Sequence, residues 1–299
     1  MKMLSASRFW QWCRKKPFAA FTLAIILLVA LATLYGVTRP ARHDRDWVDH
    51  LSRLPHVNQA QDVFAVVPLR DWTYDANGPV AQHWIDTPQE YAVDQLRNVW
   101  LMVEPHPGLE AMAHTLVLFE FADDRLLGLT IEARREKDEG FDAFWGNWGR
   151  FELIYVWASA RDLLTRRAVY LDHDVQVFPL TLTDDQRTDF LHAVLAETER
   201  IEARPRLYNT LFSNCTNELA KAARLDWDPA FVTTGHAASR LHEMGVIPPS
   251  DEPFALVRQR ASIADDLKLL NLLPPASFDA AFLTLLRARS ARNPATGTG

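Results

Sequence analysis

The sequence predicts an α+β protein in which an N-terminal membrane-spanning helix precedes an antiparallel sheet and then a helix-rich second half. Three observations support this prediction. Residues 18–37 form a run of twenty residues without a charge. Residues 62–177 contain several short strand-like runs whose connections are mostly too short for helical crossovers, which favours antiparallel pairing. Beyond residue 183, apolar residues recur at helical spacing.

Composition narrows the class of protein further. The chain has 299 residues, of which 48% are apolar and 23% charged, as in an ordinary folded protein. Its two cysteines are too few for a disulfide scaffold or a four-cysteine zinc site. The net charge is −6, and the first 16 residues contain five basic side chains and no acid. The rest of the chain is therefore still more acidic, which argues against a nucleic-acid partner.

The uncharged run predicts a membrane anchor. Twenty helical residues span about 30 Å, the thickness of the hydrocarbon core. Because the basic residues precede the run, the positive-inside rule places residues 1–17 in the cytoplasm as a tail and the body outside. A buried core helix and a cleaved signal peptide are the alternatives, since Ala30-Leu31-Ala32 fits the small-x-small cleavage pattern. The apolar residues that continue to Val37 favour a single-pass anchor over 18–37.

After the anchor, we expect a linker over residues 38–61, in which Trp47, Leu51 and Leu54 suit one short amphipathic helix. Residues 63–69 then form a short apolar run that Pro68 interrupts. Strands are predicted at residues 114–121, 126–134, 151–157 and 168–177.

Helices dominate the second half. Residues 184–203 place apolar side chains on one face, and Thr183 or Asp184 can cap the start. A second helix is expected from Cys215 to Arg224. Further helical segments are expected around residues 237–244, 254–272 and 278–289, and the tail at 293–299 is expected to be disordered.

Cys215 is the strongest candidate for chemistry. Asn214 is a preferred N-cap residue, so Cys215 becomes the first residue of the helix. The free N–H groups and the positive dipole end at that position favour thiolate over thiol, which makes the sulfur nucleophilic. Because Cys13 precedes the anchor, Cys215 is the only thiol of the exported body. A buried structural cysteine is the alternative.

His114 is the best-placed base for this thiol, because it opens a predicted strand and can face a helix that packs against the sheet end. The next strand offers Thr130 and Glu132 to orient the imidazole, the third role in a catalytic triad. Pairing of Glu132 with Arg134 or Arg150 is an equal alternative.

Metal and cofactor sites are not indicated. The chain lacks the nucleophile elbow, the phosphate-binding loop, the dinucleotide fingerprint and the zinc-protease motif. Asp172-His173-Asp174 invites a metal interpretation, but strand alternation would point the histidine away from both aspartates. We therefore expect neither a metal nor an organic cofactor.

Five ordered segments resemble the Lnb N-terminal periplasmic domain family over residues 62–225, and more loosely to Arg287. They are Asp71-Trp72-Thr73-Tyr74, Ala113-His114-Thr115-Leu116, residues 131–136, residues 152–156, and residues 208–216. The namesake of this family is a bacterial lipoprotein N-acyltransferase, and members are thought to use an essential thiol. The order of His114, Glu132 and Asn214-Cys215 also resembles circularly permuted papain-like enzymes, such as the lecithin:retinol acyltransferase group.

The resemblance implies a permuted papain-like catalytic domain over 62–225, a helical C-terminal extension over 226–292, and pairing of His114 with Cys215. It implies a periplasmic thiol acyltransferase held in the bacterial inner membrane. Cys215 would take an acyl chain from a phospholipid as a thioester and pass it to an amine, with a lipoprotein N-terminus as one candidate. A papain-like cell-wall peptidase or amidase and a non-catalytic tethered binding module are the alternatives.

A lipid substrate would also explain an aromatic segment over residues 141–149, whose glycines indicate a loop. Aromatic side chains suit the boundary between apolar material and water. We expect Phe144, Trp145 and Trp148, together with Asn214, to contact the substrate at the acyl-chain entrance or the bilayer. The alternative is that these rings fill the core.

Overall fold

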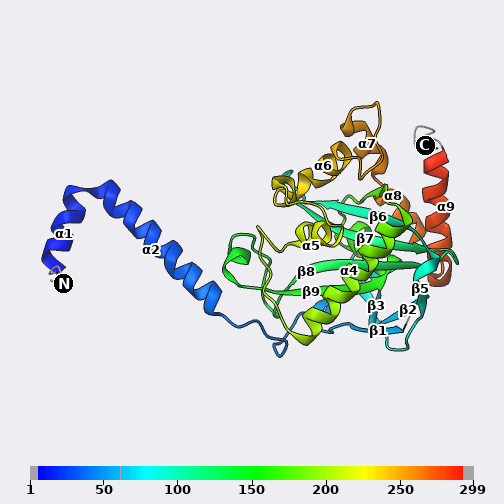
Figure 1. Cartoon of the computed structure of the whole chain (residues 1–299), viewed down its shortest axis with the longest axis horizontal. Helices are drawn as coiled ribbons and strands as arrows, with labels where there is room; N and C mark the ends of the chain where they lie inside the picture. The colour runs from blue at the N-terminus through cyan, green and yellow to red at the C-terminus, as the bar shows by residue number, and fades with distance from the viewer. Residues whose placement is uncertain (1–5, 61, 292–299) are drawn as a thin grey trace.

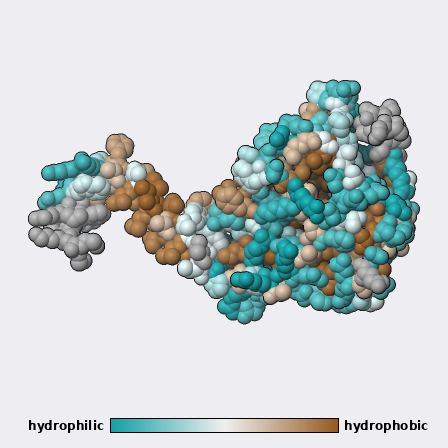
Figure 2. Space-filling view, viewed as in Figure 1, coloured by the Kyte–Doolittle hydropathy of each residue, from teal (hydrophilic) through white to brown (hydrophobic). Residues whose placement is uncertain are grey.

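The computed structural model describes residues 6–60 and 62–291. At the N-terminus, α1 (Ala6–Lys15) precedes α2 (Pro17–Thr38), which extends away from the domain (Figure 1). Pro17 suits the first turn of α2, where its missing N–H costs nothing. The helix is long and apolar enough over Pro17–Gly36 to cross a membrane. Figure 2 shows it as an apolar stretch leading to a domain whose surface is largely hydrophilic.

A seven-stranded sheet forms the centre of the domain, in the order β10-β6-β7-β8-β9-β3-β4. Neighbouring strands are antiparallel, except that β3 and β9 join through one parallel pair. The bounds are β3 (Leu69–Asp75), β4 (Gly78–Ile85), β6 (Leu96–Pro105), β7 (Ala113–Phe121), β8 (Leu126–Arg134), β9 (Glu152–Ser159) and β10 (Gln176–Pro179). A small sheet is made of β1 (His56–Ala60), β2 (Val63–Val67) and β5 (Tyr91–Ala92). The expected α+β class with an antiparallel sheet is confirmed.

Helices cover both faces of the main sheet. Val117 and Phe119 of β7 pack in one core cluster with α4 (Asp184–Ala203) and α5 (Cys215–Ala222), which cross in front of the sheet in Figure 1. Leu116 and Leu118 point to the other face. There they pack with α3 (Ala160–Thr165), α8 (Ala264–Leu270) and α9 (Phe278–Ala291). Burial on both faces explains why β7 is apolar along its length.

The strands expected over 114–121, 126–134 and 151–157 and the helix expected over 184–203 are confirmed. Helix α4 begins with a capping box made by Thr183 and Gln186. The strand expected over 168–177 is wrong. Ser159 caps α3, the chain continues into a π-helical turn at Arg166–Tyr170, and β10 begins only at Gln176. The helix expected over 254–272 is broken into α7 (Phe254–Ala261) and α8, because the N–H of Ile263 bonds to the Val175 carbonyl instead.

Residues 38–61 pack on the domain rather than forming the expected linker. Trp47 and Leu51 are buried, and β1 pairs with β2. The buried Arg134 guanidinium lies over the Trp47 ring and donates to the Leu51 carbonyl at 2.8 Å. Only a 3-10 turn, Asp49–Leu51, forms where an amphipathic helix was expected.

The helices expected as a C-terminal extension pack on the main sheet and share its core. Phe282 and Leu283 of α9 are fully buried in the cluster that contains Leu116. Helices α6 (Ala237–Glu243) and α7 lie towards the β6 and β10 edge of the sheet (Figure 1). The tail expected to be disordered, 293–299, lies outside the described residues.

Candidate active site

A fork in the main sheet creates the candidate site. The β7–β8 ladder ends at the pair Leu116–Thr130. Beyond it, β7 continues beside β6 as far as Ala113, while β8 continues beside β9 as far as Arg134. The two strands therefore separate at this end. A cavity of about 420 Å³ lies there, lined by residues of β6, β7 and β8, the π-helical turn and the start of α5.

Cys215 lines this cavity as the first residue of α5, and it is only 5% exposed. The Asn214 side chain accepts from the Asn217 N–H at 2.8 Å and donates to the carbonyls of Thr210 and Phe231 at 2.8 and 2.9 Å. Both the oxygen and the nitrogen of the Asn214 side-chain amide are therefore hydrogen-bonded within the protein. Asn214 caps the helix that begins at Cys215 and also lines the cavity, so its contact with a substrate stays a prediction.

His114 lies in the fork beside the thiol. Its Nε2 is 2.7 Å from Thr130 Oγ1, and Thr130 in turn donates to Glu132 Oε1 at 2.9 Å. Glu132 also lies 3.3 Å from the same imidazole nitrogen. The Cys215 thiol is close enough to interact electrostatically with the same imidazole. The structure thus brings together the three residues that we expected to form the site.

The other pairings considered for Glu132 do not form. Arg134 donates to main-chain carbonyls, and Arg150 pairs with Glu139 at 3.3 Å. The sequence analysis missed the actual arginine partner, Arg167, whose buried guanidinium lies 3.4 Å from Glu132 and 2.8 Å from Glu104. No sequence signal identified Arg167, because its position depends on the unexpected helical turn.

The segment Asp172-His173-Asp174 separates its three side chains. Only His173 lines the cavity, with Nδ1 2.6 Å from Glu104. Asp172 pairs with Lys268, and Asp174 accepts from Gln176. Among residues 6–60 and 62–291, no group of histidine, cysteine or carboxylate side chains is arranged to hold a metal ion.

The electrostatics of the site favour an ion pair between thiolate and imidazolium. Burial lowers the pKa of His114, but the Glu132 carboxylate and the Cys215 thiolate outweigh it and raise the pKa to about 10. Burial raises the pKa of Cys215, but the His114 imidazolium and hydrogen bonds from Thr115 outweigh it and lower the pKa to about 7. A nucleophilic sulfur at neutral pH follows from this arrangement.

The aromatic loop lies between the cavity and the membrane helix. Phe144 and Trp145 are 62% and 45% exposed, and Trp148 is half-buried, so these rings do not fill the core. None of the three lines the cavity, whereas Phe141 of the same loop does, and contact of the three rings with the bilayer stays a prediction. The loop packs closely against the end of α2. The space beside Gly36 is so narrow that an added Cβ would lie 2.9 Å from the Trp148 carbonyl.

Comparison with known proteins identifies one family. A family model described as the Lnb N-terminal periplasmic domain matches residues 83–259, a range that contains His114, Glu132 and Cys215. The match begins later than the expected residue 62 and continues past residue 225, but it ends before α8 and α9. No curated protein and no solved structure matches the chain.

Proposed function

Because the chain belongs to the Lnb N-terminal periplasmic domain family, we propose that it is a periplasmic thiol acyltransferase anchored in the bacterial inner membrane by α2. The observation that carries the proposal is that Cys215 and His114 line one cavity and interact electrostatically there. The loop that connects this cavity to α2 supports a substrate drawn from the bilayer.

In the first half-reaction, the Cys215 thiolate attacks the carbonyl carbon of a phospholipid ester. The tetrahedral oxyanion accepts a hydrogen bond from the Cys215 N–H. This N–H lies before the first intrahelical bond of α5, which the Glu218 N–H donates to the Asn214 carbonyl. The C–O bond then breaks, the His114 imidazolium gives its proton to the departing lysolipid alkoxide, and a thioester remains on Cys215.

In the second half-reaction, an amine attacks the thioester carbonyl, and the C–S bond breaks to release the amide. The neutral His114 imidazole accepts the proton that the amine loses, which regenerates the ion pair. The N-terminal amine of a lipoprotein is the proposed acceptor. If water replaces the amine, the same site hydrolyses its substrate, as a papain-like peptidase or amidase does.

The cavity lining favours an amphiphile. Met112, Ile131 and Phe141 supply apolar surface, and the same lining contains charged arginine and glutamate side chains. A purely polar groove would instead favour a cell-wall peptide.

Mass spectrometry of lipids and lipoproteins tests this function. Cells that carry the wild-type chain are compared with cells that carry Cys215→Ala. We expect N-acylated lipoprotein and lysophospholipid to fall together in the variant, because one transfer produces both. Unchanged lipoproteins with altered wall peptides would instead support the peptidase, and unchanged profiles in both classes would support a non-catalytic module.

A further inference from the structure

Two arginine side chains in the Cys215 cavity form no ion pair with a carboxylate of the described residues. Arg135 follows β8 and Arg166 begins the π-helical turn; both line the cavity and are half-buried. Within the described part of the chain, neither guanidinium has a hydrogen bond or an ion pair. Such charges are unusual in a partly buried position, because burial penalises an unpaired ion.

The acidic residues of the cavity are already engaged elsewhere. Glu132 pairs with His114 and Arg167 at 3.3 and 3.4 Å. Glu104 pairs with Arg167 and His173 at 2.8 and 2.6 Å. The Cys215 thiolate is balanced by the His114 imidazolium. Arg135 and Arg166 therefore leave the cavity with excess positive charge in a chain that is acidic as a whole.

The charges of Arg135 and Arg166 both act on the buried His50. Burial lowers the pKa of His50 to about 2, helped by the positive charges of Arg166, Arg70 and Arg135. Burial also lowers the pKa of Arg166; the charges of Arg167 and Arg70 act in the same direction and outweigh the opposite effect of Glu132. Arg70 is satisfied by Asp162 at 2.7 Å. A bound anion would relieve the repulsion that remains around Arg166.

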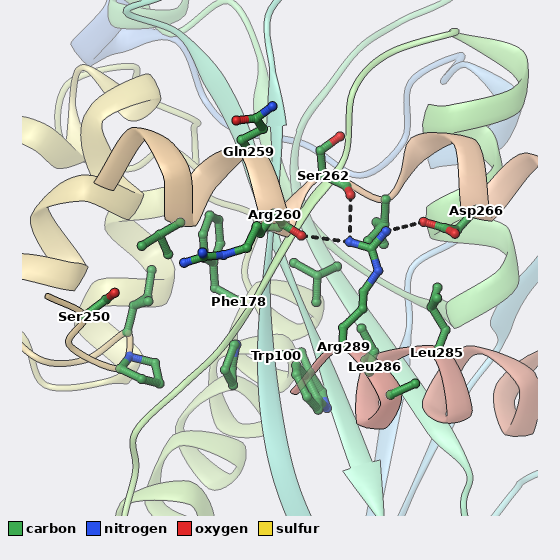
Figure 3. A pocket seen from close by; sticks show the side chains of 18 of the residues that line it. Trp100, Phe178, Ser250, Gln259, Arg260, Ser262, Asp266, Leu285, Leu286 and Arg289 are labelled. Atoms are coloured by element: carbon green, nitrogen blue, oxygen red, sulfur yellow. Dashed lines mark hydrogen bonds and ion pairs between the residues drawn. The ribbon is translucent and has the colours of Figure 1, made fainter. Parts of the chain in front are cut away.

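The larger cavity of the protein shows the opposite arrangement. This cavity of about 830 Å³ is lined by residues of β6, β10, α7 and α9. Its Arg289 donates to the carbonyls of Arg260 and Ser262 at 2.8 and 2.9 Å and pairs with Asp266 (Figure 3). The protein itself satisfies that guanidinium, so it offers no free charge to a ligand.

We propose that Arg135 and Arg166 bind the phosphate group of a phospholipid and thereby place its acyl ester at Cys215. Guanidinium groups match phosphate geometry and form charge-assisted hydrogen bonds with it. The apolar side chains of the same cavity accept the adjoining hydrocarbon. Only the fate of the ester rests on the proposed function; the phosphate contact does not require turnover.

Equilibrium binding to the full chain tests this proposal. The background is Cys215→Ala in a non-ionic detergent, so that no chemistry occurs. The ligands are dihexanoyl phosphatidylethanolamine, uncharged dihexanoylglycerol and inorganic phosphate. Arg135→Gln and Arg166→Gln are compared with Arg161→Gln. Arg161 is a matched control because it is half-buried, lies outside the cavity lining and has no side-chain partner among the described residues.

We expect each cavity variant to weaken phospholipid binding about tenfold or more, as for the loss of a charged hydrogen bond. Binding of dihexanoylglycerol should stay within about twofold, which also shows that the variants are folded, and Arg161→Gln should change neither. Equal affinity of the parent for both lipids, or unchanged phospholipid binding in both cavity variants, would overturn the proposal.

Two further outcomes are separable. Inorganic phosphate that binds as tightly as the phospholipid would assign the arginines to a free anion and overturn the lipid assignment. Arginine-dependent phospholipid binding in a protein whose wild type never transfers an acyl chain would refute the proposed function and leave this inference standing.

Discussion

The protonation of His114 depends on groups from two strands and a helix. Glu132 and Thr130 lie on one side of β8 and meet the same imidazole nitrogen, while Cys215 arrives from α5. Burial alone would remove the proton from His114, and the two negative charges keep it there. The ion pair therefore exists between the pKa of the thiol, about 7, and that of the imidazole, about 10.

Acyl transfer should follow a bell-shaped pH profile. We expect kcat/KM on a soluble ester to rise as Cys215 loses its proton near pH 7 and to fall as His114 loses its proton near pH 10. In Glu132→Gln the carboxylate no longer stabilises the imidazolium, so the falling limb should move to lower pH. Glu139→Gln, which removes a partner of Arg150, is the control. A falling limb that stays in place in Glu132→Gln would contradict the assigned role.

The sequence was sufficient to select Cys215, His114 and Glu132, because helix capping and strand alternation are local properties. It was not sufficient for Arg167 or Glu104, whose contacts depend on how a helical turn meets the sheet. It also did not reveal the hydrogen bond from Asn214 to the Phe231 carbonyl, because these residues are separated along the chain and meet only in the folded protein.

At the scale of elements, one buried ion pair holds helix α3 against strand β3. Arg70 and Asp162 are 1% and 0% exposed, and Asp162 also accepts from the Trp72 N–H at 2.7 Å. Replacing one partner would leave the other charge buried without compensation. The position of the π-helical turn, and so of Arg166 and Arg167, follows from this contact.

Asp162→Ala should therefore lower the free energy of unfolding by about 3–5 kcal/mol, the usual cost of breaking a buried pair. The exposed pair of Arg53 and Asp86 provides a control, and Asp86→Ala should cost less than about 1 kcal/mol. Urea denaturation of both variants measures the difference. Equal stabilities would show that the buried pair does not hold α3 in place.

We expect the exposed rings of the aromatic loop to affect activity at a bilayer more than the stability of the fold. Phe144 and Trp145 contact one another with ring centroids 5.2 Å apart while remaining exposed. Phe144→Ser and Trp145→Ser should change the free energy of unfolding by no more than about 0.5 kcal/mol. They should lower activity on phospholipid vesicles far more than on a short soluble ester.

Trp227→Ser is the control for this comparison, because Trp227 is 57% exposed and lies outside both the loop and the cavity lining. Equal losses on the vesicle and the soluble ester would contradict a bilayer role for the loop. A large fall in melting temperature would support a structural one.

Whether a strand could be predicted from the sequence depends on how many of its residues are buried. β7 and β8 were found because their apolar side chains are dense on both faces. β4 is an edge strand with mostly exposed residues, so it has no pattern to detect. The strand expected over 168–177 contains apolar residues that suit a strand, but a helix capped at Ser159 extends into its start.

At the scale of the whole molecule, the apolar helix α2 lies near the cavity through its contacts with the aromatic loop. Helix α2 ends beside the aromatic loop, where Arg39 donates to the Gly149 carbonyl at 2.7 Å. The loop is tied to the segment before α5 by a 2.7 Å hydrogen bond from Thr210 to the Ala143 carbonyl. Anchor, loop and Cys215 are therefore linked by short contacts.

The topology is directly testable. A reporter fused after Gly299 should be active on the periplasmic side, and the protein should remain with membranes after a high-salt wash, because α2 stays attached. A soluble form that begins near Thr33 would show cleavage at Ala30-Leu31-Ala32 and would refute the anchor.

Phe282→Ala tests whether the C-terminal helix is part of the core. We expect this change to lower the free energy of unfolding by about 3–5 kcal/mol, because Phe282 is fully buried.

Mass spectrometry of the Cys215 peptide tests the thiol mechanism most directly. The purified full chain is incubated with phospholipid vesicles without an amine, so that the second half-reaction cannot proceed by transfer. We expect a peptide heavier by one fatty acyl group, an adduct that neutral hydroxylamine removes and that is absent from Cys215→Ser and strongly reduced in His114→Ala. Lysophospholipid should appear in equal amount. Turnover with an unmodified Cys215 peptide and unchanged activity in Cys215→Ser would contradict the mechanism.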